Sequence, residues 1–185
     1  MTPQPVKPRV LIVDDTPANR YAFQSVLEDD YTVYLSGSGR RAVELARLEE
    51  FAVILLDVRM PEMDGFETAE LLRRIEKVRF TPIIFTSAYD KTMGQLTRGY
   101  VAGATDYLFS PVDSDLLKLK VATYAQIYLR SEALRLQIHQ LNLTLQGLQA
   151  ELAKRDPIES GLKVRIKELE EVIAELNRQT VGSLF

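Results

Sequence analysis

Short runs of apolar residues alternate with amphipathic segments over the first 110 positions of the chain. The runs from Val10 to Val13 and from Phe51 to Leu56 are continuously apolar, as expected of strands buried on both faces. Thr16-Pro17 follows the first run and favours the start of a helix. The predicted strands cover residues 10–13, 31–35, 51–56, 82–85 and 105–109. The predicted helices cover residues 17–27, 40–48, 65–77 and 91–102, and a last one begins at Asp113.

Five strands that alternate with five helices predict an α/β fold, in which helices cover both faces of a parallel sheet. Right-handed crossovers and a core of this size favour a flavodoxin-like five-stranded sheet with the strand order 2-1-3-4-5. In such a sheet, a ligand binds at the carboxyl ends of the strands, where the strand order reverses. A functional site is therefore expected among the residues that follow the first, third, fourth and fifth strands.

A second pattern begins in the last predicted helix. Apolar residues recur there at alternating steps of three and four, which is the spacing of a coiled-coil seam. A continuous helix from Asp113 to Arg155 would be roughly 65 Å long, too long to bury its seam on one α/β domain. The pattern predicts that the last helix extends into a long, parallel, homodimeric coiled coil. The seam residues are Ile127, Leu134, Ile138, Leu141, Leu145, Leu148, Leu152, Leu162, Ile166, Leu169, Ile173 and Leu176.

Pro157 interrupts this seam. Asp156, Pro157 and Glu159 form a pattern similar to a capping box at the start of a second helix. Leu162 nevertheless follows Leu134 by 28 residues, which is a whole number of heptads. Two arrangements are compatible with this spacing: a coil that continues through a kink, and a second helix that folds back as a hairpin. The preserved phase favours the continued coil.

These patterns divide the chain into five segments. We expect a disordered tail at 1–8, an α/β domain at 9–129, a coiled-coil extension at 130–155, a second helical segment at 156–180 and a tail at 181–185. Residues 1–111 contain 16 acidic and 13 basic side chains, so they account for the whole net charge of −3. This balance lacks the positive field of a nucleic-acid-binding protein, and no nucleic-acid partner is expected.

The apolar runs are too short to cross a bilayer, and the N-terminus lacks the apolar core of a signal peptide. We therefore expect a cytoplasmic protein with no membrane partner. The chain has no cysteine and one histidine, which leaves oxygen atoms as its candidate metal ligands.

Acidic and hydroxyl side chains follow the predicted strands. Asp14 and Asp15 follow the first strand, Asp57 the third, Ser87 the fourth and Ser110 the fifth. Taken singly, each acid is well explained as a helix cap or a loop residue. Three carboxylates that meet at one edge, however, repel one another unless a cation or protons hold them, and oxygen ligands suit Mg²⁺. A carboxylate beside Mg²⁺ can attack a phosphoryl group and form an aspartyl phosphate.

Several separated motifs closely resemble the receiver domain of bacterial response regulators. The motifs are Val13-Asp14-Asp15, Leu56-Asp57-Val-Arg-Met-Pro61, Met63-Asp64-Gly65, Ser87-Ala88 and Gly103-Ala104-Thr105-Asp106-Tyr107. The resemblance covers residues 8–129 and implies a two-component phosphorelay switch. Asp57 would accept a phosphoryl group from a histidine kinase or another phosphoryl donor.

The resemblance also implies roles for residues around Asp57. Asp14, Asp15, Asp57 and the backbone carbonyl of Arg59 would hold Mg²⁺. Ser87 would hydrogen-bond the phosphoryl group. Tyr107 would swing inward on activation.

Ser110 departs from the family pattern, because receivers normally carry lysine immediately before the proline that follows the fifth strand. Serine supplies no positive charge for the phosphoryl oxygens. One alternative is therefore a phosphorylation-independent pseudo-receiver that acts as a dimeric interaction scaffold.

A second alternative is that the chain is the regulatory N-terminal fragment of a larger enzyme, such as a diguanylate cyclase, a phosphatase or a histidine kinase. A self-contained enzyme is not expected, because Arg59 stands where an aspartyl-nucleophile phosphatase would carry a second acid.

Overall fold

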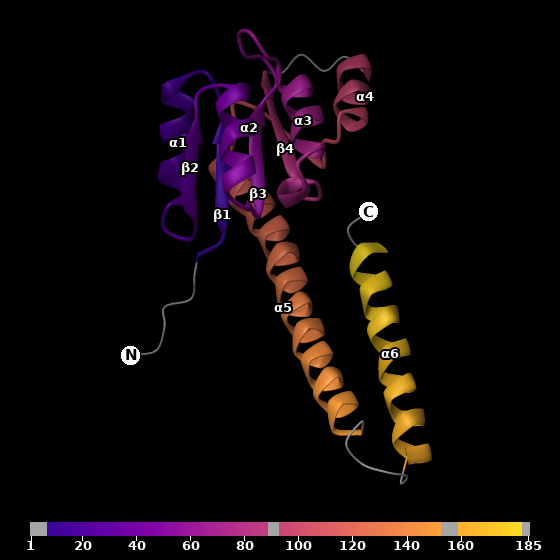
Figure 1. Ribbon diagram of the computed structural model, residues 1–185. Helices are drawn as coiled ribbons and strands as arrows, with labels where there is room; N and C mark the ends of the chain where they lie inside the picture. The colour runs from indigo at the N-terminus through magenta and orange to yellow at the C-terminus, as the bar shows by residue number, and fades with distance from the viewer. Residues whose placement is uncertain (1–6, 89–92, 153–158, 183–185) are drawn as a thin grey trace. The chain divides into compact units, whose positions relative to one another are not determined.

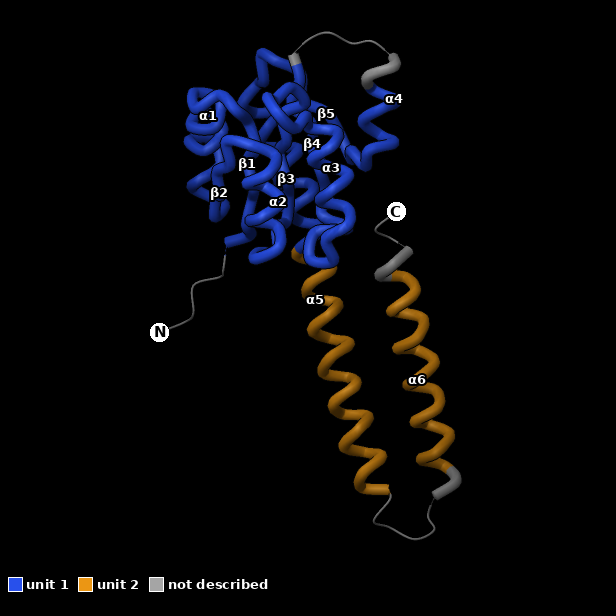
Figure 2. The backbone as a smooth tube through the Cα atoms, turned by 45° about the horizontal axis from the view of Figure 1, so that its top comes forward, with its two compact units in different colours: residues 1–128 blue, residues 129–185 orange. Residues whose placement is uncertain are grey.

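The computed structural model describes residues 7–88, 93–152 and 159–182. The chain divides into two compact units, residues 1–128 and residues 129–185, which are coloured separately in Figure 2. In the part that is described, no helix is both long enough and apolar enough to cross a membrane.

The first unit is built on a five-stranded parallel sheet with the order β2-β1-β3-β4-β5. Val13 pairs with Ser36 on one side and Leu56 on the other, and Asp57 pairs with Thr86, so the strands finish at a common edge. The α/β, flavodoxin-like class and the strand order predicted from the sequence are confirmed. The strands are β1 (Arg9–Val13), β2 (Thr32–Ser36), β3 (Val53–Asp57), β4 (Ile83–Ala88) and β5 (Asp106–Ser110).

Helices cover both faces of this sheet (Figure 1). One core cluster joins the sheet to α2 and α3, and the other joins it to α1 and the first turns of α5. The β3 residues from Val53 to Leu56 are at most 1% exposed, which explains why this strand is apolar at every position. The helices are α1 (Pro17–Leu27), α2 (Gly39–Leu48), α3 (Gly65–Arg73), the 3₁₀ turn η1 (Glu76–Val78), α4 (Met93–Val101), α5 (Ser114–Leu152) and α6 (Glu159–Gly182).

Helix α3 ends at Arg73, four residues before the end that the sequence predicted. Ile75 leaves the helical conformation, with φ −91° and ψ 117°, and packs against the core. The Arg73 guanidinium donates to the backbone carbonyls of Thr81 at 2.7 Å and Gly103 at 2.6 Å. Burial of this guanidinium lowers the pKa of Arg73 to about 10. The Arg73 side chain therefore joins the end of α3 to the segments that contain Thr81 and Gly103.

At the N-terminus, residues 1–6 lie outside the described residues, as do the first two residues of the helix predicted at 91–102. Pro8 was expected to belong to the tail, but its carbonyl accepts a hydrogen bond from the backbone N–H of Thr32 at 3.0 Å. Pro8 therefore joins the hydrogen bonding of β2 although it precedes β1.

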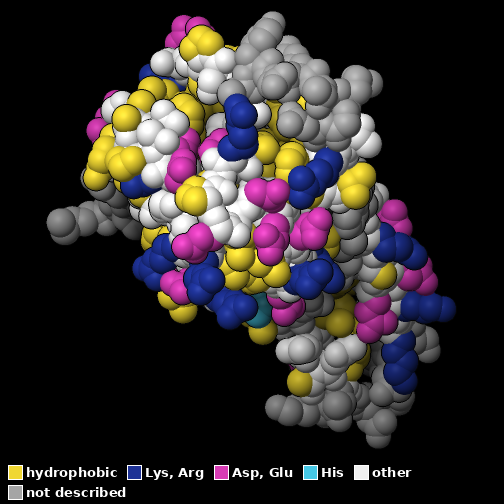
Figure 3. Space-filling model, turned by 90° about the horizontal axis from the view of Figure 1, so that it is seen from above, with side chains coloured by type: hydrophobic (Ala, Val, Ile, Leu, Met, Phe, Trp, Pro, Cys, Tyr) yellow, Lys and Arg dark blue, Asp and Glu magenta, His cyan; other side chains and the backbone are white. Residues whose placement is uncertain are grey.

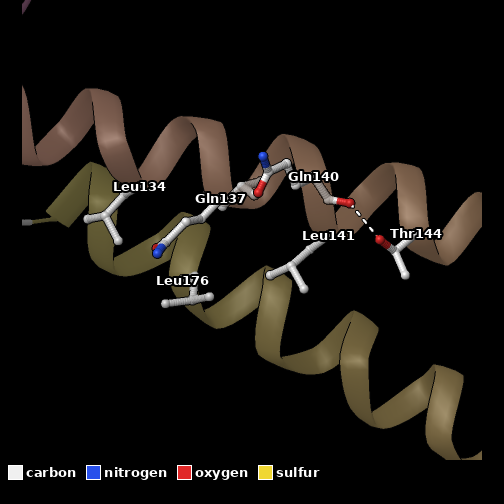
Figure 4. Close-up of a pocket in the computed structure, with 7 residues that line it drawn as sticks. Leu134, Gln137, Gln140, Leu141, Thr144 and Leu176 are labelled. Carbon is white, nitrogen blue, oxygen red and sulfur yellow. Dashed lines mark hydrogen bonds between the residues drawn. The ribbon is translucent and has the colours of Figure 1, made fainter. Parts of the chain in front are cut away.

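The second unit is an antiparallel helical hairpin. The Gln149 amide on α5 donates to the Glu170 carboxylate on α6 at 3.3 Å. Toward the end of α5, Leu148 and Leu152 line a pocket with Leu162, and further back Leu134 lines a groove with Leu176 (Figure 4).

Residues near the end of α5 thus meet residues near the start of α6, and earlier residues of α5 meet later residues of α6. This is the antiparallel arrangement drawn in Figures 1 and 2. The preference for a kinked, continued coil is therefore corrected in favour of the hairpin. Asp156 and Pro157, on which the predicted cap depends, lie outside the described residues.

The hairpin covers most of the predicted seam within one chain. Ile166 and Ile173 are buried, at 9% and 8% exposure. The premise that the seam needs a second chain to cover it is wrong, because α6 supplies that cover. Two seam residues are not covered by the hairpin. Leu162 is 43% exposed, and Ile127, which precedes the hairpin, is 41% exposed. The half-buried seam residues are Leu134, Ile138, Leu141, Leu145, Leu148, Leu152, Leu169 and Leu176.

Replacing Ile173 with alanine is expected to destabilise the hairpin by about 2–4 kcal/mol, because it removes a buried side chain and leaves a cavity. Val172 is the matched control: it is the preceding residue and is 53% exposed, so its replacement by alanine is expected to change stability by no more than about 0.5 kcal/mol. Hydrogen exchange of the α6 amides measures both effects. Equal protection in the two variants would contradict the packing described here.

Candidate functional site

Three carboxylates converge where β1 and β3 end. Asp14 and Asp15 follow β1 directly, and Asp57 is the last residue of β3. One oxygen from each carboxylate can be chosen so that all three lie within 4.8 Å of one another. Asp14 is buried at 3% exposure, Asp57 is half-buried and Asp15 is exposed. The structure therefore brings together the acids that the strand-end argument had grouped.

Neighbouring groups fix the position of Asp14. Its two carboxylate oxygens accept hydrogen bonds from the backbone N–H of Thr16 at 2.8 Å and the side-chain amide of Asn19 at 3.0 Å. Its own N–H donates to the carbonyl of Ser36 at 3.1 Å, which ties the end of β1 to β2. Thr16 stands at the predicted N-cap, but its side chain makes no capping bond. Sequence reasoning missed Asn19; its place five residues after Asp14, in the first turns of a helix, was the available signal.

Asp57 has an unusual electrostatic setting. Burial raises its pKa to about 6, and the negative charge of Asp14 acts in the same direction. Hydrogen bonds from the backbone N–H groups of Arg59 and Val58 oppose this shift but do not cancel it. A carboxylate with a raised pKa is stabilised by a nearby cation, and a divalent ion between the three acids would offset their mutual repulsion.

The donor set fits a hard divalent cation such as Mg²⁺, since it consists of carboxylate oxygens with no competing sulfur or imidazole. Asp14, Asp15 and Asp57 would hold it. The backbone carbonyl of Arg59, which the resemblance assigns as a further ligand, stays a prediction.

The loop after β3 approaches the site closely. Gly65 donates its N–H to the carbonyl of Val58 at 2.9 Å. A Cβ atom at Gly65 would lie 2.3 Å from the backbone oxygen of Asp57, so only glycine fits without moving the backbone. Asp64 caps the helix that begins here by accepting from the N–H of Glu67 at 2.8 Å. This arrangement holds the Asp57 loop against the start of α3.

Figure 3 views the first unit from the end at which its strands finish. Acidic side chains, in magenta, are interspersed there with basic ones, in dark blue. The visible face is thus mixed in charge.

The two predicted switch residues lie on β4 and β5. Ser87 is half-buried, one position beyond Thr86, which pairs with Asp57 across the sheet. Tyr107 is 8% exposed, and its hydroxyl donates to the carbonyl of Leu96 on α4 at 3.4 Å. Its burial, together with the nearby Tyr100, raises the pKa of the Tyr107 hydroxyl. The ring is turned inward in this structure.

Gly99 on α4 makes the inward position of Tyr107 possible. A Cβ atom at Gly99 would lie 1.6 Å from the Tyr107 hydroxyl oxygen and 2.8 Å from Cζ of the ring. The Tyr107 ring also packs against Phe85, with ring centroids 5.6 Å apart, and stacks on Phe109 at 5.8 Å. Sequence reasoning did not single out Gly99, because nothing in a single helical glycine indicates which distant side chain it accommodates.

Ser110 ends β5, is exposed and pairs in register with Ala88 at the end of β4. The peptide bond between Ser110 and Pro111 is cis. Lys120 does not take the place of the lysine expected at Ser110, since its ammonium pairs with Asp106, the first residue of β5.

Asp106 is the centre of a second cluster that the sequence did not reveal. Its carboxylate accepts hydrogen bonds from Lys120 and from the hydroxyl of Tyr124 at 3.2 Å, both on α5. Burial and the Asp106 carboxylate raise the pKa of Tyr124 to about 12. The cluster fixes α5 to the amino end of the strand that carries Tyr107.

A parallel sheet of this order, with acidic residues at the carboxyl ends of β1 and β3, defines the flavodoxin-like class of doubly wound α/β domains, which bind ligands at this edge. The family model for the response regulator receiver domain matches residues 10–122. The chain belongs to this receiver family of two-component systems.

Individual relatives agree with this assignment. The signal transduction histidine-protein kinase BarA of Escherichia coli K12 is 31% identical over 182 residues, which are 94% of this chain and 20% of the kinase. The transcriptional regulatory protein PcoR of Escherichia coli is 30% identical over 96% of this chain and 74% of its own length. Protein PilH of Pseudomonas aeruginosa is 34% identical over 59% of this chain and 90% of its own length. The chain thus spans only a fifth of the kinase.

Solved structures give the same answer. The receiver domain of sensor histidine kinase PA1611 from Pseudomonas aeruginosa, determined with a magnesium ion in its active-site cleft, has a TM-score of 0.61 and 29% identity. It aligns with 65% of this chain and 99% of its own. Chemotaxis protein CheY4 of Vibrio cholerae has a TM-score of 0.60 and 31% identity, over 65% of this chain and 99% of its own.

Proposed function

We propose that this chain is a phospho-accepting receiver in which Asp57 is the acceptor. The observation that carries the proposal is the convergence of Asp14, Asp15 and Asp57 within 4.8 Å at the carboxyl edge of the sheet. Bound Mg²⁺ would neutralise charge on the incoming phosphoryl group. The ionised Asp57 carboxylate attacks phosphorus, an oxygen–phosphorus bond forms, and the bond from phosphorus to the donor breaks.

The donor we propose is the phosphohistidine of a histidine kinase. In that transfer the phosphorus–nitrogen bond breaks and the imidazole leaves with a proton. Small acyl phosphates and phosphoramidates carry the same reactive group and serve as substitutes in vitro. The chain accepts the phosphoryl group and holds it as an acyl phosphate, so its role is that of a switch rather than an enzyme.

The signal is proposed to leave the site through β5 and α5. Phosphorylation would draw in the Ser87 hydroxyl and favour the inward Tyr107 ring, which contacts α4 through Leu96. The Asp106 cluster joins β5 to α5, whose later turns form the hairpin.

Ser110 favours a second candidate function, the phosphorylation-independent pseudo-receiver. An exposed serine stands where the family carries lysine, and the described lysine near β5 is engaged by Asp106. In this second function the carboxylates are vestigial, and partners dock on the receiver unit without a phosphoryl group.

Incubation of the full chain with acetyl phosphate and Mg²⁺, followed by intact-mass measurement, tests the proposal. We expect one added phosphoryl group, and no addition when EDTA removes the metal. The Ser110→Lys variant is expected to bind the phosphoryl analogue beryllofluoride at least about 10-fold more tightly, because lysine adds a charge-assisted bond worth roughly 1.5–3 kcal/mol. No adduct on wild type in the presence of Mg²⁺ would overturn phosphorylation and leave the scaffold function.

A further inference from the structure

The segment 136–150 of α5 carries no charged side chain. The segment 136–150 contains no Asp, Glu, Lys or Arg in 15 residues, whereas α6 contains nine of them in 24. Solvated faces of helices usually carry charged side chains. A 15-residue segment without any is therefore a feature that packing inside the hairpin does not explain.

Three leucines on α5 lie opposite the seam that α6 covers. Leu136 follows Leu134 by two residues and precedes Ile138 by two, so it lies about 160° around the helix from each of them. Leu129 and Leu143 occupy the equivalent positions, one heptad before and after. Leu129, Leu136 and Leu143 are 47%, 65% and 54% exposed.

Small or neutral residues separate these leucines. Ala133, Gln140, Gly147 and Ala150 are all exposed, and a Cβ atom at Gly147 would meet nothing within 4 Å. We call these seven residues the outer stripe: Leu129, Ala133, Leu136, Gln140, Leu143, Gly147 and Ala150. It extends over three heptads, or about 32 Å of helix. A strict seven-residue repeat of leucine is the spacing by which one helix packs along another.

A groove between the two helices opens beside the outer stripe. Leu134, Leu141, Gln140 and Thr144 of α5 line it on one side and Leu176 of α6 on the other, and the Thr144 hydroxyl donates a 2.9 Å hydrogen bond to the Gln140 carbonyl (Figure 4). Gln140 thus belongs both to the groove and to the outer stripe. A helix laid along the stripe would be bordered by this groove.

We propose that the outer stripe of α5 pairs with the same stripe of a second copy of this chain. Heterotypic helix pairs are usually selected by charges that flank the apolar seam, and the segment 136–150 offers none. Two identical faces that carry no charge from 136 to 150, by contrast, meet over that segment about a two-fold axis without like-charge repulsion. The second copy is therefore the occupant that fits the absence of charge and the heptad repeat together.

The pairing uses side chains on the opposite side of α5 from the hairpin seam, so it leaves α6 in place. Two hairpins would associate into a four-helix assembly with the charge-free 136–150 segments of α5 at its centre and the charged α6 helices outside. The dimer would be the element that receives the signal from the receiver unit, and only this role depends on the proposed function. Its test needs no phosphoryl donor, so the dimer and the phosphorylation can fail separately.

Sedimentation velocity of the full chain over a range of concentrations tests the dimer. We expect wild type to reach twice its chain mass of 21.0 kDa. The double variant L136E/L143E is expected to raise the dimer dissociation constant at least about 100-fold, since it removes two apolar contacts per chain and introduces four carboxylates. Its helix content should not change, because both positions are exposed.

The matched control is V164E/V172E on α6, where the two valines are 59% and 53% exposed. It makes the same chemical change on the other helix and should leave the dimer intact. A wild-type monomer at all concentrations would overturn the proposal. A dimer that survives L136E/L143E, or one that V164E/V172E weakens equally, would overturn it as well.

Discussion

Replacing Asp57 with asparagine is expected to abolish phosphoryl uptake while making the receiver unit more stable at neutral pH. Asparagine has no anionic oxygen to attack phosphorus, so the adduct on intact chain should be lost completely. The amide has nearly the shape of the carboxylate but no charge. It therefore avoids the cost of holding an anion in the half-buried site beside Asp14.

The direction of the stability change follows from the pKa of Asp57, which is raised to about 6 in the folded chain. The unfolded value is about 3.9, so between the two values the folded state binds more protons than the unfolded state. Stability contributed by the protonated carboxyl is then present at low pH and is lost as pH rises to about 6. The asparagine variant has no such loss.

Thermal unfolding in EDTA at pH 5 and at pH 7.5 measures this effect. We expect the melting temperature of wild type, relative to that of the Asp57→Asn variant, to be lower at pH 7.5 than at pH 5. Added Mg²⁺ should raise the melting temperature of wild type at pH 7.5 and have much less effect on the variant. Asp106→Asn is a useful control, since Asp106 lies at the opposite end of β5. An identical pH response in wild type and Asp57→Asn would contradict the electrostatic account.

Replacing Gly99 with alanine is expected to expel the Tyr107 ring from its inward position. The new Cβ would lie 1.6 Å from the Tyr107 hydroxyl, which no small shift can relieve. Exposing the ring costs roughly 1.5–3 kcal/mol, and alanine in a helix returns about 1 kcal/mol relative to glycine. The net destabilisation is therefore about 0.5–2 kcal/mol, with nearly complete transfer of the ring to an outward position.

A double-mutant cycle isolates this contact from other effects of the substitution. In a Tyr107→Leu background the hydroxyl and Cζ are absent, so Gly99→Ala should be neutral or stabilising. Ring exposure is read from fluorotyrosine NMR, with the Tyr107→Phe variant to assign the signal. If Gly99→Ala costs the same stability in both backgrounds, the clash with Tyr107 is not its cause.

If the inward ring accompanies activation, as the family resemblance implies, Gly99→Ala also separates phosphorylation from its consequence. The variant keeps Asp14, Asp15 and Asp57 and should still form the adduct. Signals that depend on the inward ring should be lost. The adduct and ring position are measured on the same sample, so a defect in one does not obscure the other.

The fold and the acid cluster were predictable because both depend on the order of residues along the chain, without knowledge of three-dimensional contacts. The run from Val53 to Leu56 is apolar at every position, which is typical of a strand in the middle of a parallel sheet, buried on both faces. The carboxyl ends of parallel strands lie at one edge, so Asp14 and Asp57 could be brought together without knowledge of any contact. The contributions of Asn19 and Gly99 depend on side-chain positions, which sequence spacing does not determine.

The hairpin shows a different limit. Antiparallel and parallel helix pairs both use seam residues spaced at three and four, so the 28-residue interval between Leu134 and Leu162 favours neither arrangement. The preserved phase had been interpreted as a continued coil. Only contacts such as Gln149 with Glu170 decide between the two arrangements.

The short connection between α5 and α6 has a further consequence for association. Helix α5 ends at Leu152 and α6 begins at Glu159, so α6 is tethered by six residues to the seam that it covers. A short tether gives an effective local concentration on the order of millimolar. For the α6 of a second chain to displace the tethered α6 from this seam, the concentration of that chain would have to approach the effective local concentration. Exchange of α6 between chains should therefore be negligible at lower protein concentrations, even though the same leucines would be buried either way.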